Sequence, residues 1–516
     1  MNFLAFLQKL LREKLKPFIQ DPTVSVDLGG NDVFCVFFIS IITFFIRFWN
    51  FQHPPNLVFD EIHFGNFTNF YIKGQYFFDI HPPLAKFLIA FIGYLSEYDG
   101  SIAFSKIYGK PYPDEFYISL RMTPIIISSL TPVFIYLALR FASFSIISSL
   151  TSALLITFDT TSLCESKFIL TDGILHFFVA LCLAIHNYWL TLNPGTTNYE
   201  IWKYITSLSL GCAFSVKYTA MSLCFVIGFT QIVHLFQQAD YILDEELYRQ
   251  VCIRAAQLFL PAISIHIIFW MIHLILIPYA GPDTSKFDIE SYHLLNKTNT
   301  TDDLVDKSYI LQGSFLISRV FNIILSIQFS NAMNYQPHPY MSRPIDWPLL
   351  TDVWVGFWSE NQMEVDCVGN IFVNYIGFIG VLFGLFAFKK PNWIKGMRFI
   401  VGYFMSYLPF FLVPRTMFLY HYIIPLMFAA MSFGVTLDLY FPPFWKGLVV
   451  SIALLLAAFG FFFWSPLVYA TQLEAESRNI RILNKAWIFG NQGRGKWVKY
   501  MHSQFDIIKR RENITQ

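Results

Sequence analysis

The chain has 516 residues, of which 55% are hydrophobic, only 14% are charged and 58 are phenylalanine. Soluble globular proteins carry about 25% charged residues, so this composition excludes an ordinary soluble protein and indicates an integral membrane protein. The formal net charge of +1 offers no electrostatic basis for a nucleic-acid partner.

Hydropathy predicts an all-α polytopic protein with about eleven membrane-spanning helices, since each span needs about 20 apolar residues. Residues 1–31 are expected to form a cytoplasmic amphipathic N-terminus that lies at the interface. An N-terminal module, 32–278, holds the predicted spans 32–50, 116–139, 143–158, 168–191, 201–216, 218–236 and 252–278. A C-terminal module, 371–466, holds 371–388, 398–414, 418–439 and 446–466.

The remaining segments are expected to lie outside the membrane core. Leu84–Leu95 is apolar but too short to span, so it should lie in the interface or re-enter. The distribution of Lys and Arg in short loops favours a cytoplasmic N-terminus. Loops 51–115 and 279–370 are then luminal, and an odd span count places the polar tail 467–516 on that side too.

Ionisable residues gather at the predicted luminal ends of the spans, whereas transporters place them near the middle. A carboxylate beside cations at a membrane surface suits a reaction on a lipid-linked phosphate. The carboxylate can act as general base on an incoming hydroxyl, and Arg or Lys can hold the departing phosphate. The structural alternative is a set of interfacial ion pairs with snorkelling Lys and Arg side chains. The residues concerned are Asp60, Glu61, His81, Arg121, Glu165, Asp172, Lys217, Arg415 and His421.

The seven cysteines show no CxxC pair and no metal-ligand spacing, so no metal site is predicted. Only Cys164 and Cys367 fall in loops assigned to the luminal side. A disulfide between these two is one possibility, and two free thiols are the other.

Two motifs in loop 51–115 are distinctive: Phe59–Gly65 reads FDEIHFG, and Tyr71–Lys86 reads YIKGQYFFDIHPPLAK. Further along the chain stand Arg121, ESKFILTD at 165–172, KYT at 217–219, HPYMSRPIDWPLL at 338–350 and RTMFLYHY at 415–422. Together these motifs closely resemble the protein O-mannosyltransferase family, and the resemblance covers most of residues 32–470.

The resemblance implies a GT-C fold and a glycosyltransferase, multi-pass in the endoplasmic reticulum membrane with a luminal active site. Such enzymes transfer mannose from dolichyl phosphate mannose to Ser or Thr hydroxyls of secretory and membrane proteins, with inversion. The lipid-linked donor, acceptor polypeptides and the bilayer are the implied partners, with a homo- or heterodimer involving another family member. No organic cofactor is implied, and a divalent cation is left open.

The resemblance also implies residue roles. Adjacent side chains diverge, so one of Asp60 and Glu61 should be the base while the other binds acceptor or orients the loop, with Asp60 favoured as base. Arg121 and Arg415, followed by Lys217, are the candidates for binding the donor phosphate. The supporting or acceptor-binding candidates are His81, Glu165, Asp172 and His421.

The sequence departs from the family pattern at two places. Many eukaryotic members carry three MIR repeats in the loop that corresponds to 279–370, which is too short here to hold them. Lys167 stands where the family usually has Arg, and the two hold a charge differently, so Lys167 is assigned no catalytic role.

Two other functions compete with protein mannosylation. The acceptor of a lipid-linked sugar can be a lipid or glycan instead of a protein. The chain can also be non-enzymatic, as a transporter or as an inactive partner subunit, although no predicted span carries a central acidic cluster.

Overall fold

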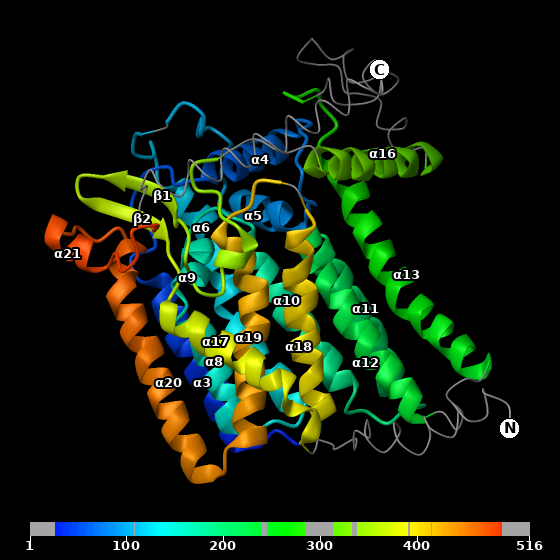
Figure 1. The fold of residues 1–516 in the computed structure, drawn as a ribbon. Helices are drawn as coiled ribbons and strands as arrows, with labels where there is room; N and C mark the ends of the chain where they lie inside the picture. Colours follow the sequence, from blue (N-terminus) through cyan, green and yellow to red (C-terminus); the bar gives the residue numbers. More distant parts are fainter. Residues whose placement is uncertain are drawn as a thin grey trace, which may run out of the picture.

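The computed structural model describes residues 26–107, 109–238, 245–283, 313–332, 338–390, 393–413 and 415–487, which are mostly helical (Figure 1). The predicted N-terminal amphipathic helix and residues 488–516 of the tail lie outside this part of the chain.

A bundle of helices fills the predicted membrane region, with a helix at each of the predicted spans. They are α3 (Gly30–Phe48), α6 (Phe116–Ser129) with α7 (Thr131–Phe141), α8 (Ile146–Thr157), α10 (Asp172–Trp189), α11 (Thr197–Phe214), α12 (Ser222–Gln238), α13 (Glu245–Leu276), α17 (Ile371–Leu385), α18 (Trp393–Tyr407), α19 (Ile423–Tyr440) and α20 (Pro443–Trp464).

Fewer of these helices qualify as spans by length and composition alone. Within the described residues six do, or seven if α8 and the short α9 (Thr160–Lys167), bent by 58°, form one broken span. Some of the others are short, and α10 buries the polar residues His176 and His186 inside the bundle. The protein is thus a multi-pass membrane protein, and the count of about eleven spans stays a prediction.

One end of the bundle, uppermost in Figure 1, is covered by the segments that the sequence placed in loops. We call it the site end. It carries α4 (Glu61–Lys73), α5 (Leu84–Leu95), α16 (Gly313–Ala332), α21 (Ala475–Ile480) and the antiparallel hairpin of β1 (Val355–Glu360) and β2 (Met363–Cys367). The short apolar segment 84–95 is therefore a helix across the end of the bundle.

Short 3₁₀ turns connect these elements: η2 (Tyr218–Met221), η5 (Pro344–Asp346), η6 (Ala387–Lys389), η7 (Leu408–Phe411), η8 (Leu419–Tyr422) and η9 (Ser465–Leu467). Two of them, η2 and η8, immediately precede α12 and α19 and lie where motif residues are concentrated.

Helix α19 forms the centre of the bundle, since every residue from Ile423 to Leu437 is buried. It packs closely against α17, where a Cβ added to Gly380 would lie 2.5 Å from the Cα of Phe433. Small residues allow such close helix contacts in membranes, where dispersion rather than water exclusion holds helices together. A second buried cluster joins α4, α13 and α16 at the site end.

The part of the tail that the structure describes folds back onto the hairpin. Arg478 on α21 forms an ion pair with Glu364 on β2, with an N–O distance of 2.7 Å. The indole N–H of Trp487 donates to the carbonyl of Leu350 at 2.5 Å. Residues up to 487 therefore lie on the same side of the bundle as loop 51–115, the arrangement that the odd span count predicted.

Candidate active site

The site is organised around the acidic pair at the start of α4. Phe59, just before the pair, has φ +47°, a conformation that costs a non-glycine residue about 1–2 kcal/mol. The hairpin holds this turn: the Phe59 N–H donates to the carbonyl of Phe357 at 3.2 Å, and the two rings stack at a centroid distance of 4.1 Å. The turn sends the side chains of Asp60 and Glu61 to different surroundings.

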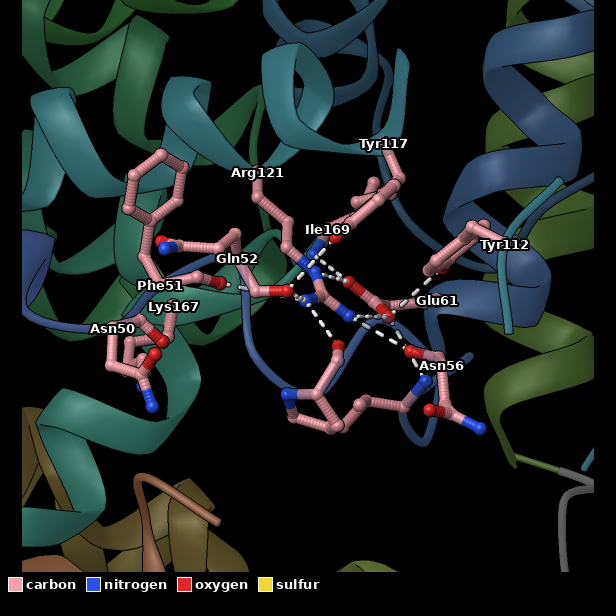
Figure 2. Close-up of polar contacts among 12 residues, drawn as sticks. Asn50, Phe51, Gln52, Asn56, Glu61, Tyr112, Tyr117, Arg121, Lys167 and Ile169 are labelled. Atoms are coloured by element: carbon pink, nitrogen blue, oxygen red, sulfur yellow. Dashed lines mark hydrogen bonds and ion pairs between the residues drawn. The ribbon is translucent and has the colours of Figure 1, made fainter. Parts of the chain in front are cut away.

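Glu61 is fully buried and its carboxylate is saturated with hydrogen bonds (Figure 2). Arg121 donates to both of its oxygens, from Nε at 2.7 Å and from Nη2 at 2.8 Å. The Tyr112 hydroxyl donates at 3.0 Å, and the backbone N–H groups of Val58 and Ile169 donate at 2.9 and 3.0 Å. Glu61 therefore joins loop 51–60, α6 and the segment after α9.

Arg121 is also fully buried, and its remaining donors are used by backbone carbonyls of loop 51–56 (Figure 2). Nη1 donates to Pro54 at 2.8 Å and Nη2 to Asn56 at 2.9 Å, with longer contacts of 3.4 Å from Nη1 to Phe51 and Gln52. All five N–H groups are thus engaged inside the protein. This geometry suits an internal clamp and leaves no donor for a phosphate.

Asp60 differs from its neighbour, because its side chain is partly exposed and its carboxylate makes no hydrogen bond within the described part of the chain. Its charged surroundings are His63, Lys217, Asp172 and Asp79. Desolvation raises the pKa of the Asp60 carboxyl to about 6, and the nearby His63 and Lys217 side chains oppose this rise. A carboxylate with this pKa can accept a proton at neutral pH more readily than an ordinary Asp.

Lys217 and Asp172 form an ion pair beside Asp60. The Lys217 ammonium donates to both carboxylate oxygens of Asp172, at 3.0 and 2.9 Å. Glu165, buried on α9, lies within electrostatic reach of this pair and of Asp60. The fold brings Asp60, Glu165, Asp172 and Lys217, which were all candidates from the sequence, near one another.

Tyr420 on η8 is the central residue that the sequence reasoning did not single out. Its ring is buried, packs edge-on against Phe59 at 6.3 Å and lies 5.8 Å from the Lys217 ammonium. It lies within electrostatic reach of both Asp60 and Arg415. Its place in the motif at 415–422 was the only available signal, because its importance depends on contacts with distant segments.

Arg415 lies within electrostatic reach of Tyr420, and part of its guanidinium makes no hydrogen bond to the described residues. Nη1 donates to the Oδ1 of Asn331 on α16 at 2.6 Å, and the buried Nε has no hydrogen-bond partner among the described residues. His421 lies within electrostatic reach of Arg415 and Lys217, and its Nδ1 accepts the backbone N–H of Phe418 at 3.1 Å. Among the described residues, Arg415 therefore keeps a buried N–H donor that could bind an added acceptor.

His81 belongs to a separate small network on the loop between α4 and α5. Its Nδ1 lies 3.3 Å from Asp79, and Lys86 forms an ion pair with the same carboxylate while donating to the His81 carbonyl at 2.7 Å. Burial alone raises the pKa of Asp79, but Lys86 and His81 outweigh it and hold that pKa well below its usual range. The network fixes the loop that borders Asp60.

The two cysteines considered for a disulfide lie side by side. Cys164 on α9 and Cys367 on β2 are both buried, their thiols interact, and both are free in this structure. The Cys367 thiol also lies 4.0 Å from Glu165. Within the described residues, no three His, Cys, Asp or Glu side chains form a group that could hold a metal ion.

Two family models match regions that together cover most of the chain. Residues 37–281 match the family model described as dolichyl-phosphate-mannose-protein mannosyltransferase, and residues 319–487 match the C-terminal four-helix membrane region of protein O-mannosyltransferase. The chain belongs to the protein O-mannosyltransferase family. The predicted resemblance is confirmed, and the two matched regions carry all nine candidate residues.

Curated family members align with about half of the chain. Dolichyl-phosphate-mannose–protein mannosyltransferase 4 of Saccharomyces cerevisiae is 31% identical over 283 residues, which is 54% of this chain and 37% of that protein. Protein O-mannosyl-transferase 2 of Danio rerio is 30% identical over 260 residues, 49% of this chain and 34% of that protein. The aligned region spans little more than a third of these relatives.

A solved structure shows the same fold. It is the S. cerevisiae protein O-mannosyltransferase Pmt1-Pmt2 complex bound to the sugar donor, 18% identical to this chain with a TM-score of 0.79. The match covers 92% of this chain and 94% of that one. The predicted GT-C membrane fold is thereby confirmed.

Proposed function

We propose that this protein transfers mannose from dolichyl phosphate mannose to Ser or Thr hydroxyls of polypeptides, at the luminal face of the endoplasmic reticulum membrane. The observation that carries the proposal is that Asp60 and Arg415 both lie within electrostatic reach of Tyr420, and that each keeps polar atoms without a hydrogen-bond partner among the described residues. A candidate base and a candidate phosphate-binding cation thus lie near the same tyrosine. The names of the relatives support this choice of reaction.

The chemistry follows from this arrangement. Asp60 takes the proton of the acceptor hydroxyl as its oxygen bonds to the anomeric carbon of mannose. The bond from that carbon to the phosphate oxygen breaks, and the lipid phosphate leaves with the electron pair. Attack opposite the leaving group inverts the anomeric centre. Arg415 stabilises the growing charge on the phosphate, because a charge-assisted hydrogen bond strengthens as the leaving oxygen becomes anionic.

The supporting groups divide into two kinds. Lys217, paired with Asp172, adds positive potential near the phosphate, and Glu165 and His421 shape the field around that pair. Glu61 and Arg121 act as positioning residues that hold loop 51–60. This proposal departs from the expectation that Arg121 binds phosphate, since its donors are all engaged. The proposed assembly is a dimer with a second family member, and no step requires a metal ion.

Donor labelling tests the proposed function directly. Purified protein in nanodiscs receives dolichyl phosphate [³H]mannose with a Ser/Thr-rich peptide, alone and together with a second family member. We expect the label to appear on the peptide in a form released by alkaline β-elimination. Label in a lipid or free glycan contradicts the protein acceptor. The absence of any transfer under both conditions contradicts the enzymatic proposal.

The rate is expected to depend on the ionisation of Asp60. The deprotonated form is the active base, so acid removes activity and the loss begins as pH falls through about 6. Below that point kcat/KM should fall about tenfold per pH unit, since it reports the essential base of the free enzyme. A flat profile between about pH 5 and 7, with the fold intact by thermal melting, contradicts Asp60 as base.

The stacking of Phe357 on Phe59 predicts a distant effect on catalysis. Phe357→Ala removes the support of the left-handed turn that places Asp60, and small misplacements of a catalytic group cost up to about 10²-fold in rate. We expect kcat to fall about tenfold with the donor KM little changed. Trp358→Ala is the matched control, because Trp358 is the next aromatic residue of β1 and is only partly buried, whereas Phe357 is buried. Equal losses of kcat in both variants would contradict the proposal that Phe357 supports the turn that places Asp60.

A further inference from the structure

Helix α16 has three faces of different character. Leu316, Val320, Ile323 and Ile327 are buried against the cluster that joins α4 and α13. A second face presents an apolar stripe at four-residue spacing: Ile317, Phe321, Leu325 and Phe329. A third face presents exposed polar residues, Ser318, Asn322 and Ser326. At about 100° per residue, the stripe lies between the buried face and the polar face.

The large apolar side chains of this stripe are more exposed than is usual for a helix surrounded by water. Leu325 and Phe329 are 65% and 68% exposed, and the only charged residue of α16 is Arg319, which is buried. A helix with this composition is also unlike a span, because it lies across the end of the bundle and is not among the helices able to cross a membrane (Figure 1). α16 therefore has one face against the protein, an apolar stripe beside it and polar residues beyond the stripe. This arrangement is typical of a helix that lies in the membrane interface.

The lipid-facing surface of α13 leads directly to the stripe. Trp270 and Leu274 of α13 pack on the buried face of α16, while Ile268, Ile272 and Ile275 of α13 remain exposed. α13 is long and apolar enough to cross the membrane, so its exposed apolar residues face lipid. Figure 1 shows α16 lying across the site end of this helix. Exposed apolar residues therefore extend to the last turn of α13, at the end across which α16 lies.

The last turn of α16 reaches the candidate active site. The Asn331 Nδ2 donates to the carbonyl of Ile80 at 3.0 Å, and its Oδ1 accepts the Arg415 guanidinium at 2.6 Å. Ile80 lies between Asp79 and His81 in the loop that borders Asp60. One side chain thus ties α16 both to that loop and to the proposed phosphate-binding cation.

We propose that α16 lies in the lipid interface at the site end through its apolar stripe, and that Asn331 at its end positions Arg415 for the donor phosphate. The second half rests on the proposed function. A lipid-linked substrate carries its phosphate in this interface. A helix that lies there can therefore hold Arg415 at the depth of the phosphate. Asn331 acts through Arg415 and is a positioning residue.

Fluorescence quenching tests where α16 lies. A cysteine at Leu325 or at Ser326 is labelled with the environment-sensitive dye NBD in a Cys252→Ser background, because Cys252 is exposed. The protein is placed in nanodiscs whose lipids carry a doxyl group near the headgroup. We expect quenching at 325 to exceed quenching at 326 several-fold. Equal quenching at both sites, or protection of 325 from both lipid-borne doxyl and aqueous iodide, overturns the lipid placement.

Kinetics test the positioning role of Asn331. Asn331→Leu keeps the side-chain size but removes both hydrogen bonds, so the KM for dolichyl phosphate mannose should rise about tenfold, as expected for a lost bond to a charged group. The peptide KM and kcat should stay within about twofold. Asn331→Asp, which still accepts from Arg415, should recover part of the loss. Ser326→Ala, on the polar face, serves as control.

The outcomes separate the two proposals. An unchanged donor KM in Asn331→Leu, or a loss confined to kcat, overturns the positioning role. A wild-type protein that transfers no mannose contradicts the proposed function and with it the role of Asn331. In that case the quenching experiment still decides whether α16 lies in lipid.

Discussion

Replacing Asp60 by asparagine is expected to lower kcat/KM for mannosyl transfer by about 10²–10⁴-fold, the usual contribution of a positioned general base. The amide has nearly the same shape and cannot accept the proton of the acceptor hydroxyl. The fold should be unaffected, because the Asp60 carboxylate makes no hydrogen bond within the described residues. The variant therefore separates chemistry from stability.

The measurement is transfer of labelled mannose to a peptide, with donor binding and the melting temperature followed in parallel. Glu115→Gln provides the matched control, since Glu115 is an exposed carboxylate of the same loop with no side-chain cap bond. Its activity should equal that of the wild type. Transfer by Asp60→Asn within about tenfold of the wild-type rate would assign the base to another group.

Breaking the Glu61–Arg121 pair is expected to damage the fold rather than the chemistry. Both residues are fully buried, and removing one leaves the other charge without compensation, which costs about 3–5 kcal/mol. Glu61→Gln and Arg121→Met should each lower the melting temperature and the yield of monodisperse protein. Thermal unfolding in detergent measures both effects.

The double variant Glu61→Leu/Arg121→Met tests whether the two residues act as a unit. It removes both charges at once, so its loss of stability should be smaller than the sum of the single losses, although the loop carbonyls of Pro54 and Asn56 lose their donor. Additive losses would show that the two side chains act independently.

Arg121→Lys distinguishes a clamp from a phosphate ligand. Lysine keeps the charge but cannot reach Glu61 and the loop carbonyls at once, because it lacks the planar fork of guanidinium. A clamp predicts a lower melting temperature with the donor KM close to the wild-type value. The opposite result, a raised donor KM with unchanged melting, would restore Arg121 to the phosphate site.

Composition and motif spacing alone determined much about this protein. The scarcity of charge required lipid as the solvent, and the runs of apolar residues located a helix at every expected position, because each span must satisfy its own backbone hydrogen bonds. The acidic pair, the KYT motif and the motif at 415–422 marked the segments that meet at the site end. Those features depend on residue type and local order, which the sequence contains directly.

Only the tertiary structure decided what each of these residues does. Asp60 and Glu61 are adjacent and chemically alike, yet one is left open and the other is saturated by groups from three distant segments. Arg121 turns inward because the carbonyls of loop 51–56 converge on it, and segment 313–332, expected to be loop, forms a helix that reaches Arg415 through Asn331. Tyr420 likewise gains its place from Phe59 and Lys217. Such partners lie far away in the sequence, so the role of a polar side chain is set by which distant groups the fold brings within hydrogen-bonding distance.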